Sequence, residues 1–212
     1  MLILTLILSL LAGYLLGSLN ISIIIGKLKG DDIRNHGSGN AGATNSLRVY
    51  GKKIAALVLL GDALKAVVAV FVGLLIAKLS GLDAETIMFC KFLAGFGAVL
   101  GHNFPLYFGF KGGKGIITSV AFIFTVDPLA GSIILVSGVI IIAITRYVSL
   151  GSVVGAILYP ICVIVSNIGK QSATKPYYIA LSVVLALLAV YRHKANIKRL
   201  IAGNESKLGQ KK

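Results

Sequence analysis

The sequence predicts an all-α integral membrane protein with about seven transmembrane helices, some of them short. Hydrophobic residues make up 57% of the 212 residues and charged residues only 13%, and the mean hydropathy is +0.92. Soluble domains are more polar than this. The apolar residues are gathered in long stretches between short polar loops, as expected of helices that cross a bilayer. Because no stretch would form a second globular domain, residues 1–212 are predicted to be a single polytopic membrane domain.

Six spans can be placed from the apolar stretches, over residues 2–26, 54–80, 86–101, 129–145, 152–168 and 176–191. The first begins without a basic segment or a cleavage site, so we expect it to remain as a span. The span over 86–101 is short, about 24 Å as a helix, which would leave its inner end below the lipid headgroups.

The stretch from Ile116 to Thr145 is predicted to form two spans. One helix would be about 45 Å long against a hydrocarbon core of about 30 Å, and Asp127-Pro128 favours a turn in its middle. With two spans and the N-terminus outside, 16 Lys and Arg residues lie in inner loops and 3 in outer loops, whereas one span gives 10 against 9. Basic residues favour the cytoplasmic side, so seven spans and a cytoplasmic C-terminus are preferred.

Four polar segments then face the cytoplasm: residues 34–48, 101–115, 145–152 and the tail 192–212. The net charge of +14 would suggest nucleic acid in a soluble protein. Here the basic residues lie in loops between spans and no aromatic-rich basic stretch is present, which favours anionic lipid and phosphate substrates over nucleic acid. Cys90 and Cys162 lie in apolar runs without a partner at ligand spacing, so neither a metal site nor a disulfide is indicated.

Two features inside the spans indicate packing. Small residues four apart allow helices to approach closely, and they are Gly13, Gly17, Gly97 and Gly101. Asp62 and Lys65 are three apart on one helix face, where an unpaired charge would be costly. We expect them to pair and to hold the bundle around the site.

The first inner loop, Gly37 to Asn45, matches the pattern G-x-G-x-x-G. No strand precedes it, so a Rossmann fold is excluded. Its glycines, Gly39 included, would let backbone N–H groups approach an anion, and Arg48 is placed to bind a phosphate through its forked guanidinium. Further neutral donors are Ser38, Asn40, Thr44 and Asn45. A flexible loop between two helices is the alternative, but it needs no such density of donors.

The loop from Gly101 to Gly115 places Lys111 and Lys114 among glycines, just before a helix start. This arrangement favours an anion nest aided by the helix dipole. Lys114 is followed by Gly115 rather than Ser or Thr, so the Walker A pattern is absent and nucleotide hydrolysis is not supported. A basic turn that only sets topology would explain the lysines but not the glycines.

Two weaker segments follow. Arg146 and the hydroxyl of Ser149 lie at a helix junction, where a topology anchor is an equal alternative. The tail is a basic amphipathic stretch that could lie on anionic lipid. His193 and Asn196 would share one face of it and could reach a ligand.

Together these segments resemble the bacterial PlsY family of acyl-phosphate glycerol-3-phosphate acyltransferases over nearly the whole chain. The similar segments are GSGNAGATNSLR from Gly37, GHNFPLYFGFKGGKG from Gly101, TRYVSLGS from Thr145 and RHKANIKRLIAGNESKLG from Arg192. The resemblance implies transfer of a fatty acyl group from acyl phosphate to the 1-hydroxyl of glycerol 3-phosphate, giving lysophosphatidic acid and inorganic phosphate. Departures from the family pattern are Asn20, where Pro is usual, and Ala195, where Glu is common.

The resemblance also implies roles for individual residues. The glycerol 3-phosphate clamp would consist of Ser38, Arg48, Lys114, His193 and Asn196. The acyl phosphate would be held by Thr44, Gly112, Gly113, Arg146 and Ser149. We predict Ser38, Arg48, Lys114, Arg146 and Ser149 as catalytic. The predicted substrate-binding residues are Gly39, Asn40, Thr44, Asn45, His102, Lys111, Gly112, Gly113, His193 and Asn196.

The expected location is the bacterial plasma membrane, with the active site on the cytoplasmic side. The expected partners are the two substrates and membrane lipid, with the soluble enzyme that makes acyl phosphate as a further candidate. No metal or cofactor is expected.

The mechanism is predicted to be direct, substrate-assisted transfer. No histidine is followed five positions later by Asp, and no acid lies within the glycine loops, so a carboxylate-oriented histidine base is hard to build. Acyl phosphate has a good leaving group whose oxygens could accept the hydroxyl proton. Ser38 as a covalent nucleophile is the mechanistic alternative. A transporter of phosphate or organophosphate and a structural membrane subunit are the alternative functions.

Overall fold

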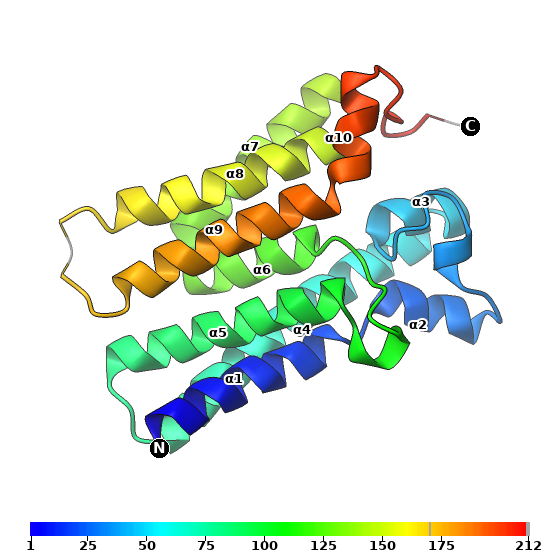
Figure 1. Cartoon of the computed structure of the whole chain (residues 1–212). Coiled ribbons are helices and arrows are strands. Elements are labelled where there is room, and N and C mark those ends of the chain that lie inside the picture. The colour runs from blue at the N-terminus through cyan, green and yellow to red at the C-terminus, as the bar shows by residue number, and fades with distance from the viewer. Residues whose placement is uncertain (170, 211–212) are drawn as a thin grey trace. The chain divides into compact units, whose positions relative to one another are not determined.

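The structure, a computed structural model, describes residues 1–169 and 171–210, and every regular element in those residues is a helix (Figure 1). The long helices are α1 (Leu2–Gly17), α4 (Lys52–Leu79), α5 (Ala84–Asn103), α7 (Pro128–Thr145), α8 (Val148–Ser166) and α9 (Lys175–Arg192). The shorter ones are α2 (Ile21–Leu28), α3 (Ala43–Tyr50), α6 (Ile116–Val126), α10 (Lys194–Ile201) and the single turns η1 (Ile33–Asn35) and η2 (Leu106–Phe108). Among the described residues, six helical stretches are long and apolar enough to cross a membrane. The predicted all-α membrane fold is confirmed.

The first predicted span is broken into α1 and α2. Asn20 begins α2, because its side chain accepts the N–H of Ile23 at 3.2 Å, and its Nδ2 donates to the carbonyl of Ala41 at 3.3 Å. An N-cap of this kind replaces the helical hydrogen bond that the chain loses at the break. The break therefore ties the membrane helix to the first glycine loop.

The predicted turn at Asp127-Pro128 is confirmed. α6 ends at Val126, Pro128 is the first residue of α7, and the Asp127 side chain accepts the N–H of Ala130 at 3.0 Å. With 11 residues, α6 is about 17 Å long, roughly half of the hydrocarbon core. The number of complete crossings and the side of each terminus stay predictions.

Two predicted span boundaries differ from the observed helices. α5 has 20 residues, about 30 Å, so the inference drawn from a short span over 86–101 loses its basis. α8 begins at Val148 rather than at Ser152, because Tyr147 already has the extended backbone of an N-cap. The segment 145–152 is therefore mostly helical, and Ser149 lies in the first turn of α8.

The chain divides into two compact units, Met1–Val126 and Asp127–Lys212, and the prediction of one domain stays a prediction. In the first unit α1 packs against α4 and α5 (Figure 1). A Cβ on Gly13 or Gly17 would overlap the carbonyl oxygen of Ala94 or Ala98, and one on Gly97 or Gly101 would overlap the backbone of α1. The predicted packing role of these glycines is confirmed. In the second unit α8 packs against α7 and α9.

Candidate active site

Asn45 shapes the first glycine loop. Its Oδ1 accepts the N–H of Ser38 at 2.8 Å, and its Nδ2 donates to the carbonyls of His36 (2.9 Å) and Ile33 (3.2 Å). Both hydrogens of the amide are thus donated to backbone carbonyls just before the loop, and the side chain is buried. Asn45, predicted as a substrate donor, holds the loop in this structure.

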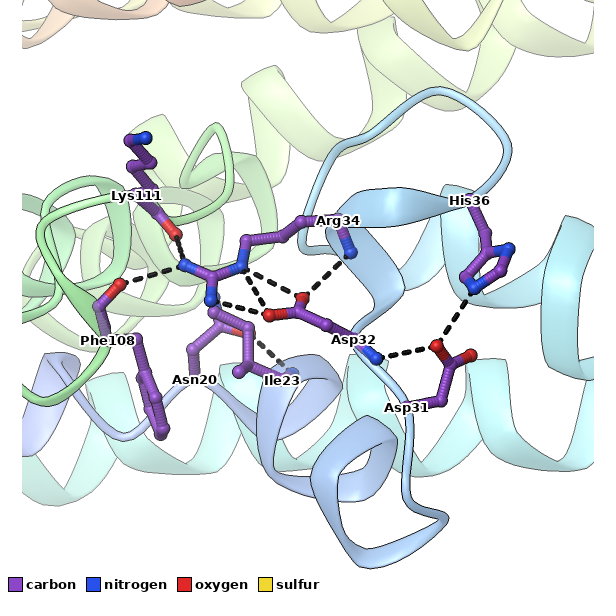
Figure 2. Close-up of polar contacts among 8 residues, drawn as sticks. All are labelled: Asn20, Ile23, Asp31, Asp32, Arg34, His36, Phe108 and Lys111. Atoms are coloured by element: carbon purple, nitrogen blue, oxygen red, sulfur yellow. Dashed lines mark hydrogen bonds and ion pairs between the residues drawn. The ribbon is translucent and has the colours of Figure 1, made fainter.

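Arg34 connects the first inner loop to the third loop, which runs from Gly101 to Gly115 (Figure 2). Its guanidinium forms a two-point pair with Asp32, at 2.6 Å for the shortest contact, while Nη1 donates to the carbonyls of Phe108 (2.8 Å) and Lys111 (3.0 Å). The hydrogen bond from Arg34 is the main cause that holds the pKa of the Asp32 carboxyl below its ordinary value. The planar fork of an arginine suits this combination of a carboxylate and two carbonyls.

Next to this pair, a carboxylate orients a histidine. His36 Nε2 lies 2.9 Å from Asp31 Oδ1, and Tyr50 donates to the other oxygen at 3.3 Å. The hydrogen bond with His36 is the largest cause of a lowered pKa at Asp31. Such a pair was predicted to be hard to build, but loop residues 31 and 36 fold against each other and form one. Both side chains are substantially exposed, so the pair lies in water rather than in a closed pocket.

The glycines of the third loop serve packing. The N–H groups of Gly112 and Gly113 donate to the carbonyls of Asn103 (3.2 Å) and His102 (3.1 Å). A Cβ on Gly112 would overlap the His102 carbonyl, and one on Gly113 would overlap His102 Nε2 and the carbonyl of Ala41. In this structure these two N–H groups bind backbone carbonyls, and the predicted substrate roles of Gly112 and Gly113 stay predictions.

The groups available for an anion in the first unit lie around the start of α3. The helix begins after Gly42 without a side-chain cap, so its first N–H groups and the positive end of its dipole are open to an anion. Thr44 and Arg48 are four residues apart and share a face of α3. Arg48, Ser38, Gly39 and Lys111 are exposed, and Asn40, Thr44 and Lys114 are partly exposed.

A buried cluster of charge lies on α4 and α5. Lys65 Nζ lies 2.8 Å from Asp62 Oδ1 and 3.0 Å from His102 Nδ1, and it donates to the carbonyl of Leu19 at 3.0 Å. The predicted pairing of Asp62 with Lys65 is confirmed. His102 was predicted to bind substrate, but its imidazole is buried against these two residues.

In the second unit, the Glu205 carboxylate accepts hydrogen bonds from three side chains, two of which were predicted as site residues. Its Oε1 accepts from Ser149 (2.7 Å) and Asn196 (2.6 Å), and its Oε2 accepts from Arg199 (2.7 Å). Burial would raise the pKa of Glu205, but these three hydrogen bonds together hold it below the ordinary value. The only hydroxyl hydrogen of Ser149 is donated to Glu205, so Ser149 could contact a ligand only as an acceptor.

The tail is also fixed at Arg146. This residue has a left-handed backbone (φ 63°), accepts the N–H of Leu208 at 2.7 Å and donates from its guanidinium to the Leu208 carbonyl at 2.8 Å. His193 is buried, with Nδ1 2.8 Å from the carbonyl of Ala189. The structure thus gives Arg146 and Ser149 contacts within their own unit, and their substrate roles stay predictions.

Within the described ranges, no group of three or more His, Cys, Asp or Glu side chains could hold a metal ion. The cysteines there, Cys90 and Cys162, are free.

Comparison with known proteins decides the family. The family model described as glycerol-3-phosphate acyltransferase matches residues 7–203. The chain belongs to the glycerol-3-phosphate acyltransferase family. Glycerol-3-phosphate acyltransferases of Thermoanaerobacter sp. (strain X514) and Clostridioides difficile (strain 630) are 45% and 44% identical to it, over 97% and 94% of this chain and 96% and 93% of theirs.

Solved structures agree with this assignment. A crystal structure of PlsY, an integral membrane glycerol 3-phosphate acyltransferase in its glycerol 3-phosphate form, matches with a TM-score of 0.80 and 36% identity over 96% of both chains. The lysophosphatidic acid form matches with a TM-score of 0.77 and 35% identity, over 96% of this chain and 95% of that one. The resemblance to the PlsY family is confirmed, and the chain is a membrane acyltransferase. The alternatives of a transporter and of a structural subunit are set aside.

Sequence reasoning missed three side chains that organise the acyltransferase: Arg34, Asp32 and Glu205. For the first two, the signal was an acid and a base two residues apart just before the glycine loop. For Glu205, it was a lone acid in a basic tail. The carbonyls that Arg34 holds and the partners of Glu205 lie at least six positions away in the chain, so spacing alone could not identify them.

Proposed function

We propose that this enzyme transfers a fatty acyl group from acyl phosphate to the 1-hydroxyl of glycerol 3-phosphate. The products are lysophosphatidic acid and inorganic phosphate, and the reaction belongs to phospholipid biosynthesis. The relatives named glycerol-3-phosphate acyltransferase and the PlsY forms with glycerol 3-phosphate and lysophosphatidic acid support the acceptor and the product.

The observation that carries this proposal is the environment of Arg48. Within residues 1–169 and 171–210 no carboxylate pairs with it, it is exposed, and it follows Thr44 by one turn of a helix whose N-terminus lacks a side-chain cap. A cation, a hydroxyl and the positive end of a helix dipole together favour a phosphate group. We assign the phosphate-binding role of the first unit to Arg48 and Thr44, with Ser38 and Lys114 as further ligands.

We propose direct transfer. The 1-hydroxyl oxygen attacks the acyl carbonyl carbon, the bond from that carbon to the phosphate oxygen breaks, and the hydroxyl proton passes to an oxygen of the departing phosphate. The protein would align two anionic substrates and stabilise negative charge that develops on the carbonyl oxygen. Arg146, Ser149, His193 and Asn196 of the second unit stay predicted ligands.

The Asp31–His36 pair is the specific observation that favours a mechanistic alternative, a histidine base near Ser38. Both partners are exposed to water, and a base in that setting gains little from its carboxylate. Direct transfer therefore remains the proposal, and His36 provides its sharpest test.

We further propose that the enzyme resides in the plasma membrane with the loops over 34–48 and 101–115 in the cytoplasm. Acyl phosphate is made by a soluble enzyme in this scheme, so the donor site must face the compartment that supplies it. In a Lys111→Cys variant whose Cys90 and Cys162 are replaced by Ala, labelling by a thiol reagent that does not cross membranes should occur only after the cells are opened.

The test of function compares donors. Purified protein is mixed with labelled glycerol 3-phosphate and, in separate reactions, with acyl phosphate, acyl coenzyme A or acyl carrier protein. Of the three donors, we expect only acyl phosphate to give lysophosphatidic acid, together with an equal amount of inorganic phosphate. Product from another donor instead would contradict the donor assignment. Trapping of an acyl-enzyme on Ser38 after mixing with acyl phosphate alone would contradict direct transfer.

A further inference from the structure

The buried cluster of Asp62, Lys65 and His102 has contacts that an ordinary ion pair does not need. The three side chains are at least nine-tenths buried. Lys65 Nζ forms an ion pair with Asp62 Oδ1 at 2.8 Å and lies within hydrogen-bond distance of His102 Nδ1 and the carbonyl of Leu19, and His102 Nδ1 lies 3.5 Å from the same Asp62 oxygen. Removing charges from water is costly, and buried ion pairs can often be replaced by apolar residues without loss of stability. Stability alone is therefore a weak explanation for this cluster.

The cluster adjoins the contact between the first and third loops. The His102 carbonyl accepts the N–H of Gly113 at 3.1 Å. A Cβ on Gly113 would overlap His102 Nε2 and also the carbonyl of Ala41. The imidazole thus has Lys65 on one side, and on the other side the point where the third loop meets the first.

The hydrogen bonds determine the state of the imidazole. An ammonium can only donate, so a charged Lys65 at 3.0 Å requires Nδ1 of His102 to accept, and the neutral ring then carries its hydrogen on Nε2. Nε2–H is the side that faces Gly113. The same ammonium holds Leu19, and the next residue, Asn20, donates to the Ala41 carbonyl at 3.3 Å. Lys65 is therefore connected to both loops.

We propose that Asp62, Lys65 and His102 form a positioning network that sets the separation of the first loop at Ala41 and the third loop at Gly113. Lys65 acts through His102 by fixing its tautomer and orientation, and Asp62 compensates the charge of Lys65. None of the three contacts substrate. The network aligns the groups that the loops present to the two substrates, so the inference rests on the proposed two-substrate transfer. It assigns to His102 a positioning role in place of the predicted binding role.

The test separates positioning from stability. Lys65→Met alone leaves the Asp62 carboxylate buried without its cation, so this variant should lose stability. The double variant Asp62→Leu/Lys65→Met contains no buried charge and should unfold within a few degrees of the wild type in detergent. Its kcat should nevertheless be at most about one tenth of the wild-type value, while KM for each substrate changes by less than about threefold. Alignment affects the transfer step more than the binding of either substrate. Lys78→Met, on the exposed end of the same helix, should match the wild type in both measurements.

A pair of His102 variants gives an independent measurement should the double variant fail to fold. Gln can accept from Lys65 and donate toward Gly113, whereas Leu can do neither. His102→Gln should retain several times more kcat than His102→Leu at similar KM. Wild-type kcat in the folded double variant, or equal kcat in the two His102 variants, would overturn the proposal. All variants are assayed with whichever donor the wild type uses, so a wrong donor assignment and a wrong network give different results.

Discussion

Arg34 offers the most direct test of how the two glycine loops are held. Replacing it by Lys keeps the positive charge and can preserve a contact with Asp32, but a single ammonium cannot also reach the carbonyls of Phe108 and Lys111. Two hydrogen bonds of 2.8 and 3.0 Å are lost. Each contributes about 0.5–1.5 kcal/mol, and the side chain is partly exposed, so we expect a loss of about 1–2 kcal/mol in the closed loop arrangement.

That loss has two measurable consequences. The amides of Phe110, Gly112 and Gly113, which donate within the third loop, should exchange with solvent about 5–30 times faster, since 1.4 kcal/mol corresponds to a factor of ten. The kcat/KM of acyl transfer, measured with purified enzyme at varied glycerol 3-phosphate and saturating acyl donor, should fall by no more than the same factor.

Asp32→Asn is the matched control for Arg34→Lys. It weakens the partly exposed ion pair, worth about 0–1 kcal/mol, but leaves Arg34 able to hold both carbonyls. We therefore expect a smaller effect than that of Arg34→Lys. Unchanged amide exchange in Arg34→Lys would refute the carbonyl clamp, and equal effects in the two variants would mean that the ion pair, rather than the carbonyl contacts, holds the loop.

Three further predictions test other parts of the site. Gly113→Ala should reduce kcat by about tenfold or more, because its Cβ would overlap both His102 and Ala41, whereas Gly138→Ala in α7, where a Cβ meets only ordinary contacts, should stay active; similar rates in the two would contradict the packing role. His36→Gln should keep kcat and its pH dependence within about twofold if the transfer is direct, and a loss of about 10²-fold would favour a histidine base. The lowered pKa of Glu205 stabilises the fold above about pH 4.5 and this contribution is lost as the pH falls through the folded-state pKa; Glu205→Gln should therefore lower the free energy of unfolding by about 2 kcal/mol at neutral pH and flatten the acidic side of a plot of Tm against pH.

The sequence was sufficient for the features that follow from hydrophobic pattern and local chemistry. Apolar stretches placed the long helices, Asp127-Pro128 predicted the break between α6 and α7, and Asp62 and Lys65 were predicted to pair because they share a helix face. An error arose at the start of α8. Val148 to Leu150 were assigned to the loop before the helix, and the end of a helix is the part that a sequence pattern locates least well.

The site could be predicted only in part, because composition does not reveal which polar groups the fold itself uses. Asn45 and Gly113 fit an anion-binding loop as well as they fit a loop that binds its own backbone. The distinction depends on partners from distant positions, such as His102 against Gly113. A pattern of glycines and donors therefore indicates the location of a site more reliably than the role of each residue.

The distribution of carboxylates explains which cations can serve a phosphate substrate. Three acids compensate basic side chains that hold the fold, in the pairs Asp32–Arg34, Asp62–Lys65 and Glu205–Arg199. In the described part of the chain Arg48 has no such carboxylate, so its field is available to an incoming anion.

Thr44→Glu would place a carboxylate one turn before Arg48, in a position that stabilises a helix. Folding should therefore be preserved. The new carboxylate would compensate the charge of Arg48 and repel the phosphate of glycerol 3-phosphate. We expect KM for glycerol 3-phosphate to rise about tenfold above that of the neutral control Thr44→Gln at low ionic strength, and the difference to shrink as salt is added. If the two variants have the same KM at low salt, Arg48 does not bind the phosphate.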